Sequence, residues 1–539
     1  MKKIIFLLLL NLLLFSCARV GAPNGGTRDS LAPKFLGSNI DTTRLNVSRT
    51  VKELRLDFDE YVMLKDFNKN FNVSPPIKKI KKVIPSNLAN KYVLIQWEDT
   101  LQANTTYNFN FGNAIVDNNE SNPLPYFNFA FSTGDKIDDL FVSGTVKDAM
   151  TLIKENQTAK DNKMVVGLYK AGENLDYKQK PDYITKVDEE NYFELNFLPK
   201  GEFVIIAFDD ENQNSVYDAG KEKVSFLKEK ITLDSTSVRG LKLKLYPSKK
   251  VVKYKESKAI NGGLLMTFEG NPETVEVKSL SEELKDFKVT HAKRSDSVNI
   301  WFDAEKSNLG GTVSKQVKLS YFTPTISDTI SVSYKAVKDE FKLSNEAGNL
   351  IAPENNFVIN TSLPIENLNT SSWKLESDSI AQDFTAKISE KNPFKILVNS
   401  SFKPTKKYVL TIPKETVSSY YSSNDKSFQF QFEIDKPENY GSFTAVIKNK
   451  PTAKFWVELT NEKGEILYSQ FTNASEVSFK NLKPATYIAR IRVDNNGNGF
   501  WDEADFAQNI AAEDVYIFEK EINVRPLWEI KEDWELTNR

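Results

Sequence analysis

The residues best placed to do chemistry form a polar loop near the C-terminus, with the spacing of a calcium-binding loop. Six of them stand where such loops place their oxygen ligands: Asp494, Asn496, Asn498, Phe500, Asp502 and Asp505. Carboxylates and amides at alternate positions wrap a hard cation, the backbone carbonyl of Phe500 supplies another ligand, and Gly499 allows the sharp turn. The loop predicts a structural Ca²⁺ site between strands; the alternative is an Asn- and Gly-rich hairpin turn without metal.

A second loop repeats this pattern in part. Four ligand positions are kept, by Asp210, Asn212, Asn214 and Asp218, whereas Lys221 stands where the last carboxylate belongs. Because a lysine ammonium replaces an oxygen ligand there, the second loop predicts a weaker Ca²⁺ site. We interpret both sites as structural rather than catalytic.

Other polar residues give no pattern of catalysis. Asp59 and Glu60, with Asp117 and Glu120, offer carboxylates near the start of the chain. A glycosidase needs two carboxylates about 5 Å or about 6.5–9.5 Å apart across a sugar cleft. Short loops between strands rarely form such a cleft, so we interpret these carboxylates as acceptors that fix loops. His291 is the single His and has no Ser–His–Asp pattern nearby. The chain is therefore expected to be non-enzymatic.

The N-terminus carries the features of an exported, lipid-anchored protein. Met1-Lys2-Lys3 is cationic, and the apolar run 4–15 is too short to span a bilayer, which takes about 20 residues. The run ends in Leu14-Phe15-Ser16-Cys17, which resembles a lipoprotein signal-peptidase box. That resemblance implies acylation of Cys17, anchoring in the outer membrane and a flexible tether over residues 17–29. The alternative is an ordinary signal peptide with an incidental Cys.

Composition narrows the classes of partner. Lys and Arg total 71 and Asp and Glu total 73, for a formal net charge of -2. A nucleic-acid-binding protein needs a basic surface that neutralises phosphates, so no nucleic-acid partner is expected. The single Cys excludes an internal disulfide and a thiolate zinc site. At 539 residues the chain has the length of about three to five domains.

Short runs of alternating apolar and polar residues recur along the chain. Phe127, Phe129 and Phe131 alternate with polar or small residues, and Phe428, Phe430 and Phe432 do the same. Period-two alternation is typical of strands with one face in a core and one face in water. Turn residues separate the runs, which predicts an all-β fold of tandem β-sandwiches in an elongated chain. The stretch 280–287 is the best candidate for a short helix.

Two segments occur twice. Residues 193–210 align with 477–494, and each continues into one of the two Asp- and Asn-rich loops. More weakly, 106–133 aligns with 407–432. The repeats predict two kinds of domain in the order A–B–x–A′–B′.

At this point a family resemblance can be stated. Phe58-Asp59-Glu60-Tyr61-Val62, Phe111-Gly112-Asn113-Ala114-Ile115-Val116-Asp117 and Phe131-Ser132-Thr133-Gly134 resemble the bacterial Ig-like domain of the SbsA surface-layer type. Together with the lipid box, they resemble the Ig-like-domain lipoproteins of Bacteroidota. Segments 138–248 and 440–525 are similar to the prealbumin-like or carboxypeptidase-regulatory sandwiches that accompany such domains. The resemblance implies an architecture more than an activity.

Seven Asp-Ser/Thr tripeptides are similar to the O-glycan acceptor pattern of periplasmic Bacteroidota proteins. Their acceptor residues would be Ser30, Thr42, Thr100, Ser235, Ser297, Thr329 and Ser379. The tripeptide is short and also common in polar turns.

Together these features predict a domain order and a function. The expected segments are a signal peptide (1–16), a lipidated tether (17–29), an Ig-like domain (30–136), a prealbumin-like sandwich (137–249), an Ig-like sandwich (250–340), a degenerate Ig-like domain (341–437), a second prealbumin-like sandwich (438–525) and a Trp-containing tail (526–539). The predicted function is a non-enzymatic outer-membrane scaffold with a protein partner, accessory to a β-barrel complex. The alternative is a surface adhesin or glycan-binding protein.

Overall fold

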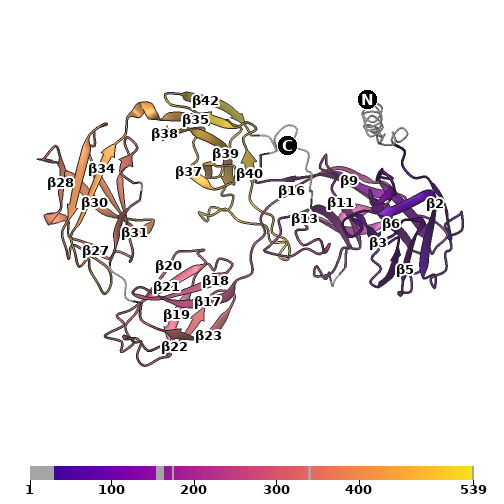
Figure 1. Cartoon of the computed structure of the whole chain (residues 1–539), viewed down its shortest axis with the longest axis horizontal. Coiled ribbons are helices and arrows are strands. Elements are labelled where there is room, and N and C mark those ends of the chain that lie inside the picture. Colours follow the sequence, from indigo (N-terminus) through magenta and orange to yellow (C-terminus); the bar gives the residue numbers. More distant parts are fainter. Residues whose placement is uncertain (1–28, 153–162, 173–174, 338–340, 347, 537–539) are drawn as a thin grey trace, which may run out of the picture.

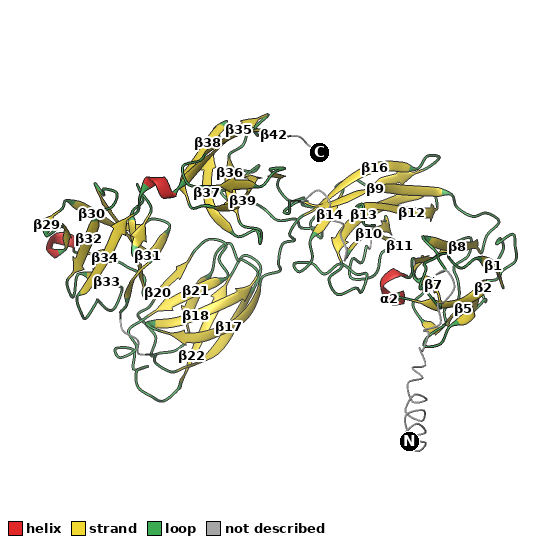
Figure 2. Cartoon of the chain, turned by 45° about the horizontal axis from the view of Figure 1, so that its top comes forward, coloured by secondary structure: helices red, strands yellow, loops and turns green. Residues whose placement is uncertain are grey.

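The computed structural model describes residues 29–152, 163–172, 175–337, 341–346 and 348–536. The described part folds as five two-layer β-sandwiches joined by short linkers (Figures 1 and 2). We call them domain 1 (35–132), domain 2 (140–245), domain 3 (253–334), domain 4 (343–434) and domain 5 (441–535). The tandem β-sandwich fold expected from the alternating runs is confirmed. Among the described residues, no helix has the length and apolarity needed to cross a membrane.

Domain 1 packs two antiparallel sheets around a core of aromatic side chains. One sheet contains β1 (Phe35–Ser38), β2 (Glu53–Leu64), β5 (Asn90–Trp97) and β4 (Ile80–Ile84), with β7 (Ile115–Asp117) paired to β2. The other contains β3 (Asn72–Ser74), β6 (Thr106–Gly112) and β8 (Phe127–Ser132). Phe109 and Phe111 of β6 point into the core, so the alternate residues Asn108 and Asn110 point to the outer face of the sheet. Helix α2 (Phe67–Asn70) precedes β3.

Domain 3, the segment between the two repeats, has the same strand order as domain 1. Its first sheet is β17 (Lys253–Ile260), β18 (Gly263–Glu269), β21 (Ser297–Trp301) and β20 (Lys288–His291). Its second sheet is β19 (Glu276–Ser279), β22 (Lys315–Phe322) and β23 (Ser327–Tyr334). The short helix expected over 280–287 is wrong: this stretch is a turn between β19 and β20.

Domain 4 keeps the same order with extra short strands. One sheet is β24 (Leu343–Asn345), β26 (Phe357–Thr361), β31 (Asn392–Ser400) and β30 (Phe384–Ser389). The facing sheet is β25 (Leu350–Ile351), β34 (Phe428–Ile434), β32 (Lys407–Ile412), β28 (Lys374–Ser377) and β29 (Ile380–Ala381). A third pair joins β27 (Asn367–Leu368) and β33 (Val417–Ser418), and the 3₁₀ turn η1 spans Thr370–Ser372.

Domains 2 and 5 share a second topology, strand for strand. In domain 2 the first sheet contains β12 (Tyr192–Leu198), β9 (Leu140–Asp148) and β16 (Val238–Leu245). The second sheet contains β11 (Tyr183–Lys186), β10 (Met164–Lys170), β13 (Gly201–Asp209) and β14 (Val224–Phe226), with β15 (Ile231–Leu233) paired to β13. In domain 5 the first sheet contains β38 (Glu476–Leu482), β35 (Gly441–Lys448) and β42 (Glu529–Glu535). The second sheet contains β37 (Ile466–Thr472), β36 (Phe455–Thr460), β39 (Ala485–Val493) and β40 (Val515–Ile517), with β41 (Ile522–Val524) paired to β39. The 3₁₀ turn η2 (Pro437–Asn439) precedes domain 5.

The expected tail over 526–539 is wrong for residues 529–535, which form β42. This strand pairs in parallel with β35, as β16 pairs in parallel with β9. Trp534 is 4% exposed and belongs to the core of domain 5, whereas Trp528 is 48% exposed. On the inward face of the last strand, the half-buried Glu532 stands between Ile530 and Trp534, so the sequence of this strand is mostly charged.

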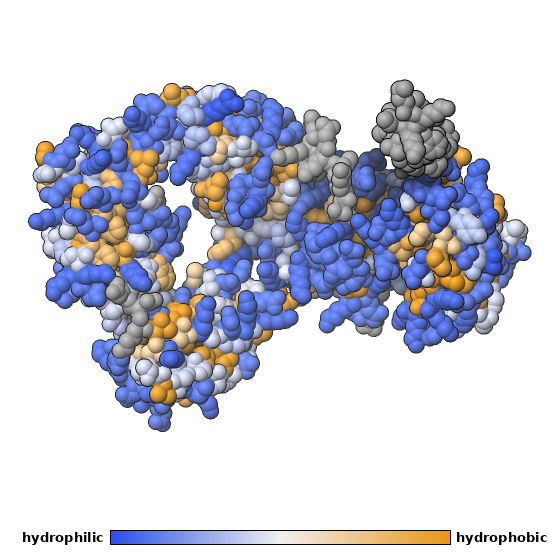
Figure 3. Space-filling view, viewed as in Figure 1, coloured by the Kyte–Doolittle hydropathy of each residue, from blue (hydrophilic) through white to orange (hydrophobic). Residues whose placement is uncertain are grey.

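Domains 3, 4 and 5 form a closed ring, seen at the left of Figure 1. One hydrogen-bonded pair marks each joint: Lys288 with Glu366, Asn481 with the carbonyl of Pro353, and Arg294 with Asp502. The space-filling view keeps an opening at the centre of the ring and shows a largely hydrophilic surface (Figure 3).

Candidate functional site

The Asp494 loop is ordered by hydrogen bonds between its own ligand candidates. The carboxylate of Asp494 accepts the backbone N–H groups of Asn498 and Gly499, each at 3.0 Å. Asp502 accepts from the side-chain amides of Asn496 and Asn498, the latter at 2.8 Å. The structure therefore brings together four of the predicted residues in one small loop.

One predicted ligand, Asp505, turns away and accepts the backbone N–H of Gln508. The ring of Phe500, whose backbone carbonyl was the predicted ligand, packs under the guanidinium of Arg294. Among the described residues, no group of three or more His, Cys, Asp or Glu side chains has a metal-holding arrangement. The carboxylates are matched to N–H donors in this arrangement, and Ca²⁺ binding stays a prediction.

A positively charged side chain of domain 3, that of Arg294, contacts the loop. Arg294 donates to Asp502 at 2.7 Å and to Glu273 at 2.5 Å. Burial opposes the ionisation of Asp502, but the hydrogen bonds from Asn496, Asn498 and Arg294 outweigh it and lower the pKa of Asp502. The loop therefore serves as a joint between domains 5 and 3.

Behind the loop lies Glu513, an acidic residue that the sequence pattern did not single out. Its carboxylate is buried and accepts the backbone N–H groups of Asn496 and Asp502 at 3.1 and 2.9 Å. Burial raises the pKa of Glu513. The number of residues between the loop and this glutamate differs between the two repeats, so a motif with a fixed twelve-residue spacing does not include it.

The Asp210 loop in domain 2 has the same internal bonding. Asp210 accepts the N–H groups of Asn214 and Ser215 at 3.0 Å, and the amide of Asn212 donates to Asp218 at 2.6 Å. Glu222 takes the place of Glu513: its two oxygens accept the N–H groups of Glu211 and Asp218. The four predicted residues of this loop are thus also brought together.

The segment after the Asp494 loop docks on domain 2. Phe506 is buried among three aromatic rings of domain 2, with ring centroids 4.4 Å from Tyr177, 5.1 Å from Phe226 and 5.9 Å from Tyr217. Backbone hydrogen bonds join Ala504 to the linker at Pro247 and Lys249. Domain 5 therefore packs against both domain 2 and domain 3.

Two of the four carboxylates near the start of the chain, Asp59 and Asp117, accept backbone N–H groups of loops, as the sequence suggested. Asp117 accepts four backbone N–H groups, from residues 119, 120, 121 and 122, at 2.7–3.1 Å. Burial alone would raise the pKa of Asp117, but these donors outweigh it and lower that pKa. The pKa of Glu60 is raised by burial and by the charge of Asp117. The ring of His291 contacts the carbonyl of Ser295 at 3.0 Å.

The modification sites predicted from sequence fall on different kinds of position. Cys17 lies outside the described residues, so lipidation stays a prediction. Six of the seven candidate glycan acceptors are exposed: Ser30, Thr42, Thr100, Ser235, Thr329 and Ser379. Ser297 is half-buried at the start of β21 and donates to Asp296 at 2.7 Å.

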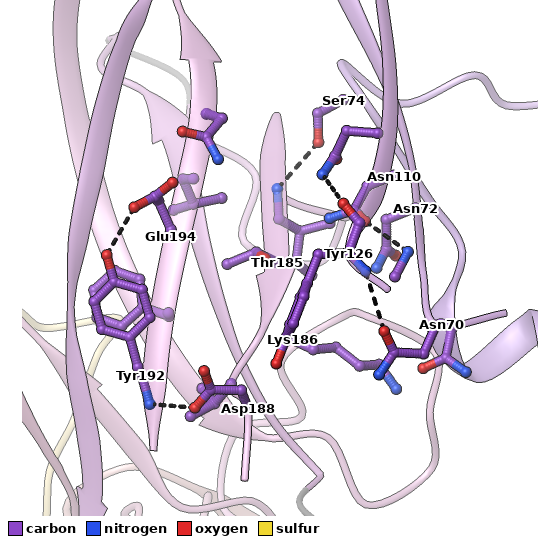
Figure 4. A pocket seen from close by; sticks show the side chains of 18 of the residues that line it. Asn70, Asn72, Ser74, Asn110, Tyr126, Thr185, Lys186, Asp188, Tyr192 and Glu194 are labelled. Carbon is purple, nitrogen blue, oxygen red and sulfur yellow. Dashed lines mark hydrogen bonds between the residues drawn. The ribbon is translucent and has the colours of Figure 1, made fainter. Parts of the chain in front are cut away.

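A cleft lies between domains 1 and 2, where no sequence motif had pointed. Its volume is about 610 Å³. One wall is the outer face of the sheet β3–β6–β8, and the other is formed by β11, β12 and the turn between them. Figure 4 shows Asn70, Asn72 and Asn110 on one side and Asp188, Tyr192 and Glu194 on the other.

Asparagines form a row across the domain 1 wall. Asn72 pairs with Asn110 across β3 and β6, and Asn110 pairs with Asn128 across β6 and β8. Neighbouring strands lie about 4.8 Å apart, so three amides stand side by side on one face. The next row contains Asn108, which is 8% exposed and whose Oδ1 has no hydrogen-bond partner.

The two walls of the cleft are held in place by direct hydrogen bonds. The backbone N–H of Ile184 in β11 donates to Oγ of Ser74 in β3 at 3.2 Å. In the linker, the N–H of Asp138 donates to Oγ1 of Thr106, whose hydroxyl donates back to the Asp138 carboxylate, both at 2.9 Å. The cleft is therefore a fixed feature of the joint between domains 1 and 2.

The alternation pattern identified β6 but not the role of its outer face. Tyr107, Phe109 and Phe111 marked the core side of this strand, so Asn108 and Asn110 read as solvent-facing. Which surface they meet depends on where domain 2 docks, and this is set by contacts far apart in sequence. The signal that was present is the density of Asn in β3, β6 and β8.

Comparison with known proteins identifies the first domain. Residues 29–133 match the family model described as bacterial Ig-like domain. Comparison with curated proteins gave no match. Among solved structures, the surface-layer protein SbsC (domains 1–6) is 12% identical, covering 92% of this chain and 67% of that one, with a TM-score of 0.15. SGBP-B of the mixed-linkage glucan utilization locus of Bacteroides ovatus, in complex with a mixed-linkage heptasaccharide, is 9% identical, covering 72% of this chain and 94% of that one, with a TM-score of 0.19.

The family match agrees with the Ig-like resemblance of residues 30–136. The lipid anchor and the bacterial phylum stay predictions. Residues 29–133 thus form a bacterial Ig-like domain, the first of a tandem series of β-sandwiches.

Proposed function

We propose that this protein is a non-enzymatic, lipid-anchored scaffold of the outer membrane, accessory to an outer-membrane β-barrel complex. The observation that carries the proposal is the set of contacts made by domain 5. It contacts domain 4 before it and closes the ring onto domain 3 through Arg294, and it also packs against domain 2 through Phe506. A chain of sandwiches joined only by linkers would leave its domains free to move. Closure fixes their loops and sheet edges in one arrangement, which lowers the entropic cost of binding a partner.

The anchor part of the proposal rests on the lipid box that ends at Cys17. Two or more acyl chains on one residue suffice for stable membrane attachment. The tether up to residue 29 would then hold domain 1 close to the membrane and leave the ring farther out.

The test is crosslinking in intact cells, followed by extraction in mild detergent, affinity capture through a C-terminal tag and mass spectrometry. We expect an outer-membrane barrel protein to be captured with the wild-type chain. The Cys17→Ser variant should lose both membrane attachment and the crosslinks. Recovery of a lone monomer in several mild detergents would contradict the scaffold, and a cytoplasmic chain that keeps Met1 would contradict the anchor.

A surface adhesin or glycan-binding protein is the second candidate function. It is favoured by the cleft between domains 1 and 2, whose asparagine row offers hydrogen-bond donors and acceptors without charge.

A further inference from the structure

The cleft between domains 1 and 2 has the size and shape of a ligand site. A volume of about 610 Å³ falls within the range of about 300–1,000 Å³ usual for such sites. Its walls are fixed by the bonds of Ser74 to Ile184 and of Thr106 to Asp138. A site that is already formed in the free protein loses little entropy when it binds.

The asparagine row sets the chemistry of the ligand. Each side-chain amide of Asn72, Asn110 and Asn128 carries two donors and one acceptor with two lone pairs. A hydroxyl group is likewise both donor and acceptor. A row of neutral amides on three adjacent strands therefore matches a ligand that presents several hydroxyl groups along its length.

Asn108 shows that the hydrogen bonding of this wall is incomplete. Its side chain is more than nine-tenths buried and lines the cleft, yet its Oδ1 has no partner. A buried acceptor without a hydrogen bond is destabilising and rare in native proteins. A hydroxyl that entered the cleft beside Asn108 would remove this cost, with a modest turn of the amide.

Tyr126 supplies an aromatic surface at the cleft. Its ring is 67% exposed, and its backbone has φ 51°, a left-handed conformation that is unfavourable for an aromatic residue. Two cleft asparagines hold it there: Asn113 accepts the N–H of Tyr126 at 3.1 Å, and Asn128 donates to its carbonyl at 2.9 Å. Figure 4 shows the ring between the two walls. An exposed ring face packs well on the C–H face of a sugar ring.

Charge excludes an anionic ligand. The domain 2 wall carries Asp188, Glu189, Glu190 and Glu194, against Lys69 and Lys186. An excess of carboxylates repels a polyanion, whereas carboxylates accept hydrogen bonds from hydroxyl groups readily. An extended peptide is also a poor match, because peptides add to the edge of a sheet, and the asparagine row lies on a sheet face.

We propose that the cleft between domains 1 and 2 binds a neutral oligosaccharide, with its hydroxyl groups on Asn72, Asn110 and Asn128 and one sugar ring on Tyr126. The inference names the ligand class and the residues of the second candidate function, on which it rests. It does not depend on the scaffold function or on the lipid anchor.

The test is calorimetric titration of the full-length chain in detergent with neutral hexasaccharides: cello-, xylo-, manno-, malto-, laminari- and chitohexaose. We expect at least one of them to bind with a Kd below about 1 mM. Asn72→Ala and Tyr126→Ala should each weaken that binding by about tenfold, the equivalent of one lost hydrogen bond or ring contact. The matched control is Asn399→Ala, an exposed asparagine on β31 of domain 4, which should bind like wild type. Thermal unfolding of each variant checks that it folds.

The outcomes separate the site from the function. Saccharide binding that survives both cleft substitutions would overturn the site and leave glycan binding intact. Failure of all six probes would overturn both. Tighter binding of hexagalacturonate, an anionic saccharide, or of a random-sequence octapeptide pool than of every neutral probe would overturn the ligand class.

Discussion

Glu222 and Glu513 occupy equivalent buried positions behind the two Asp- and Asn-rich loops. Each uses both carboxylate oxygens to accept backbone N–H groups of its loop. Burial raises the pKa of both, to about 7 for Glu222. The loop geometry thus depends on an acid that a local motif does not contain. Asp494 and Asp210 were found from spacing alone, because their partners lie within five residues in the chain.

Glu222 makes the stability of domain 2 depend on pH. Its pKa in the folded state is above the ordinary value, so its contribution is fully present below about pH 4.5 and is lost as pH rises through about 7. The free energy of unfolding should therefore fall over this window, by up to about 3 kcal/mol, relative to a Glu222→Gln variant that cannot titrate. Denaturant unfolding of both proteins at about pH 5 and about pH 7.5 measures the difference. Glu229→Gln, an exposed neighbour, is the control, and parallel pH profiles of wild type and Glu222→Gln would contradict the expectation.

Calcium at the Asp494 loop is testable through domain 5. If the loop binds Ca²⁺ in the native state alone, a chelator should lower the melting temperature of that domain. A hundredfold excess of Ca²⁺ over Kd corresponds to about 2.7 kcal/mol. The Asp494→Ala variant should lose its sensitivity to chelator. Substitution of Asp502 would be ambiguous, because it also breaks the bond to Arg294. Equal melting of the wild-type chain with and without chelator would remove metal from this loop.

At the scale of elements, the alternating runs predicted strands well because each sheet of a sandwich has one face in the core and one face in water. Phe127, Phe129 and Phe131 lie on β8, and Phe428, Phe430 and Phe432 lie on β34, as expected. The last strand was missed because its two inward apolar residues, Ile530 and Trp534, stand four positions apart among charged residues. Its place follows only from the repeat: β42 is the counterpart of β16 in domain 2.

This placement predicts different roles for the two tryptophans near the C-terminus. Trp534→Ala removes a buried ring from the core of domain 5 and should cost about 3–5 kcal/mol of stability. Trp528→Ala removes an exposed ring that packs beside Arg525 and should change stability by about 0.5 kcal/mol or less. Calorimetric melting of the two variants compares them directly. Equal effects would show that residues 529–535 do not form part of the domain.

At the scale of the whole molecule, the sequence predicted a tandem series of β-sandwiches but not how the sandwiches meet. Composition and periodicity report burial within a sandwich, and the contacts between sandwiches are few and far apart in sequence. Arg294 and Phe506 are unremarkable in the chain, yet they join domain 5 to domains 3 and 2. The cleft asparagines were overlooked for the same reason.

The closed ring predicts a measurable change of shape. Phe506→Ala removes the ring that three aromatic side chains of domain 2 surround, and should release domain 5 from domain 2. Combined with Arg294→Ala, it should increase the radius of gyration in small-angle X-ray scattering while each domain keeps its melting temperature. Phe471→Ala, at an exposed aromatic of β37, is the control. An unchanged scattering profile of the double variant would contradict a domain 5 that is held to domains 2 and 3 by these contacts.

The contact of domain 5 with domain 2 also bears on how the protein is made. Asn509 and Lys228, which bond across it, are 281 residues apart in the chain. Domains fold as units and in order of synthesis, so domain 2 is complete long before Phe506 emerges. Until then Tyr177, Tyr217 and Phe226 face water without their partner. During biogenesis there is therefore a period in which domain 2 exposes an aromatic surface that is prone to association with other chains. A chain truncated before residue 441 would expose this surface permanently.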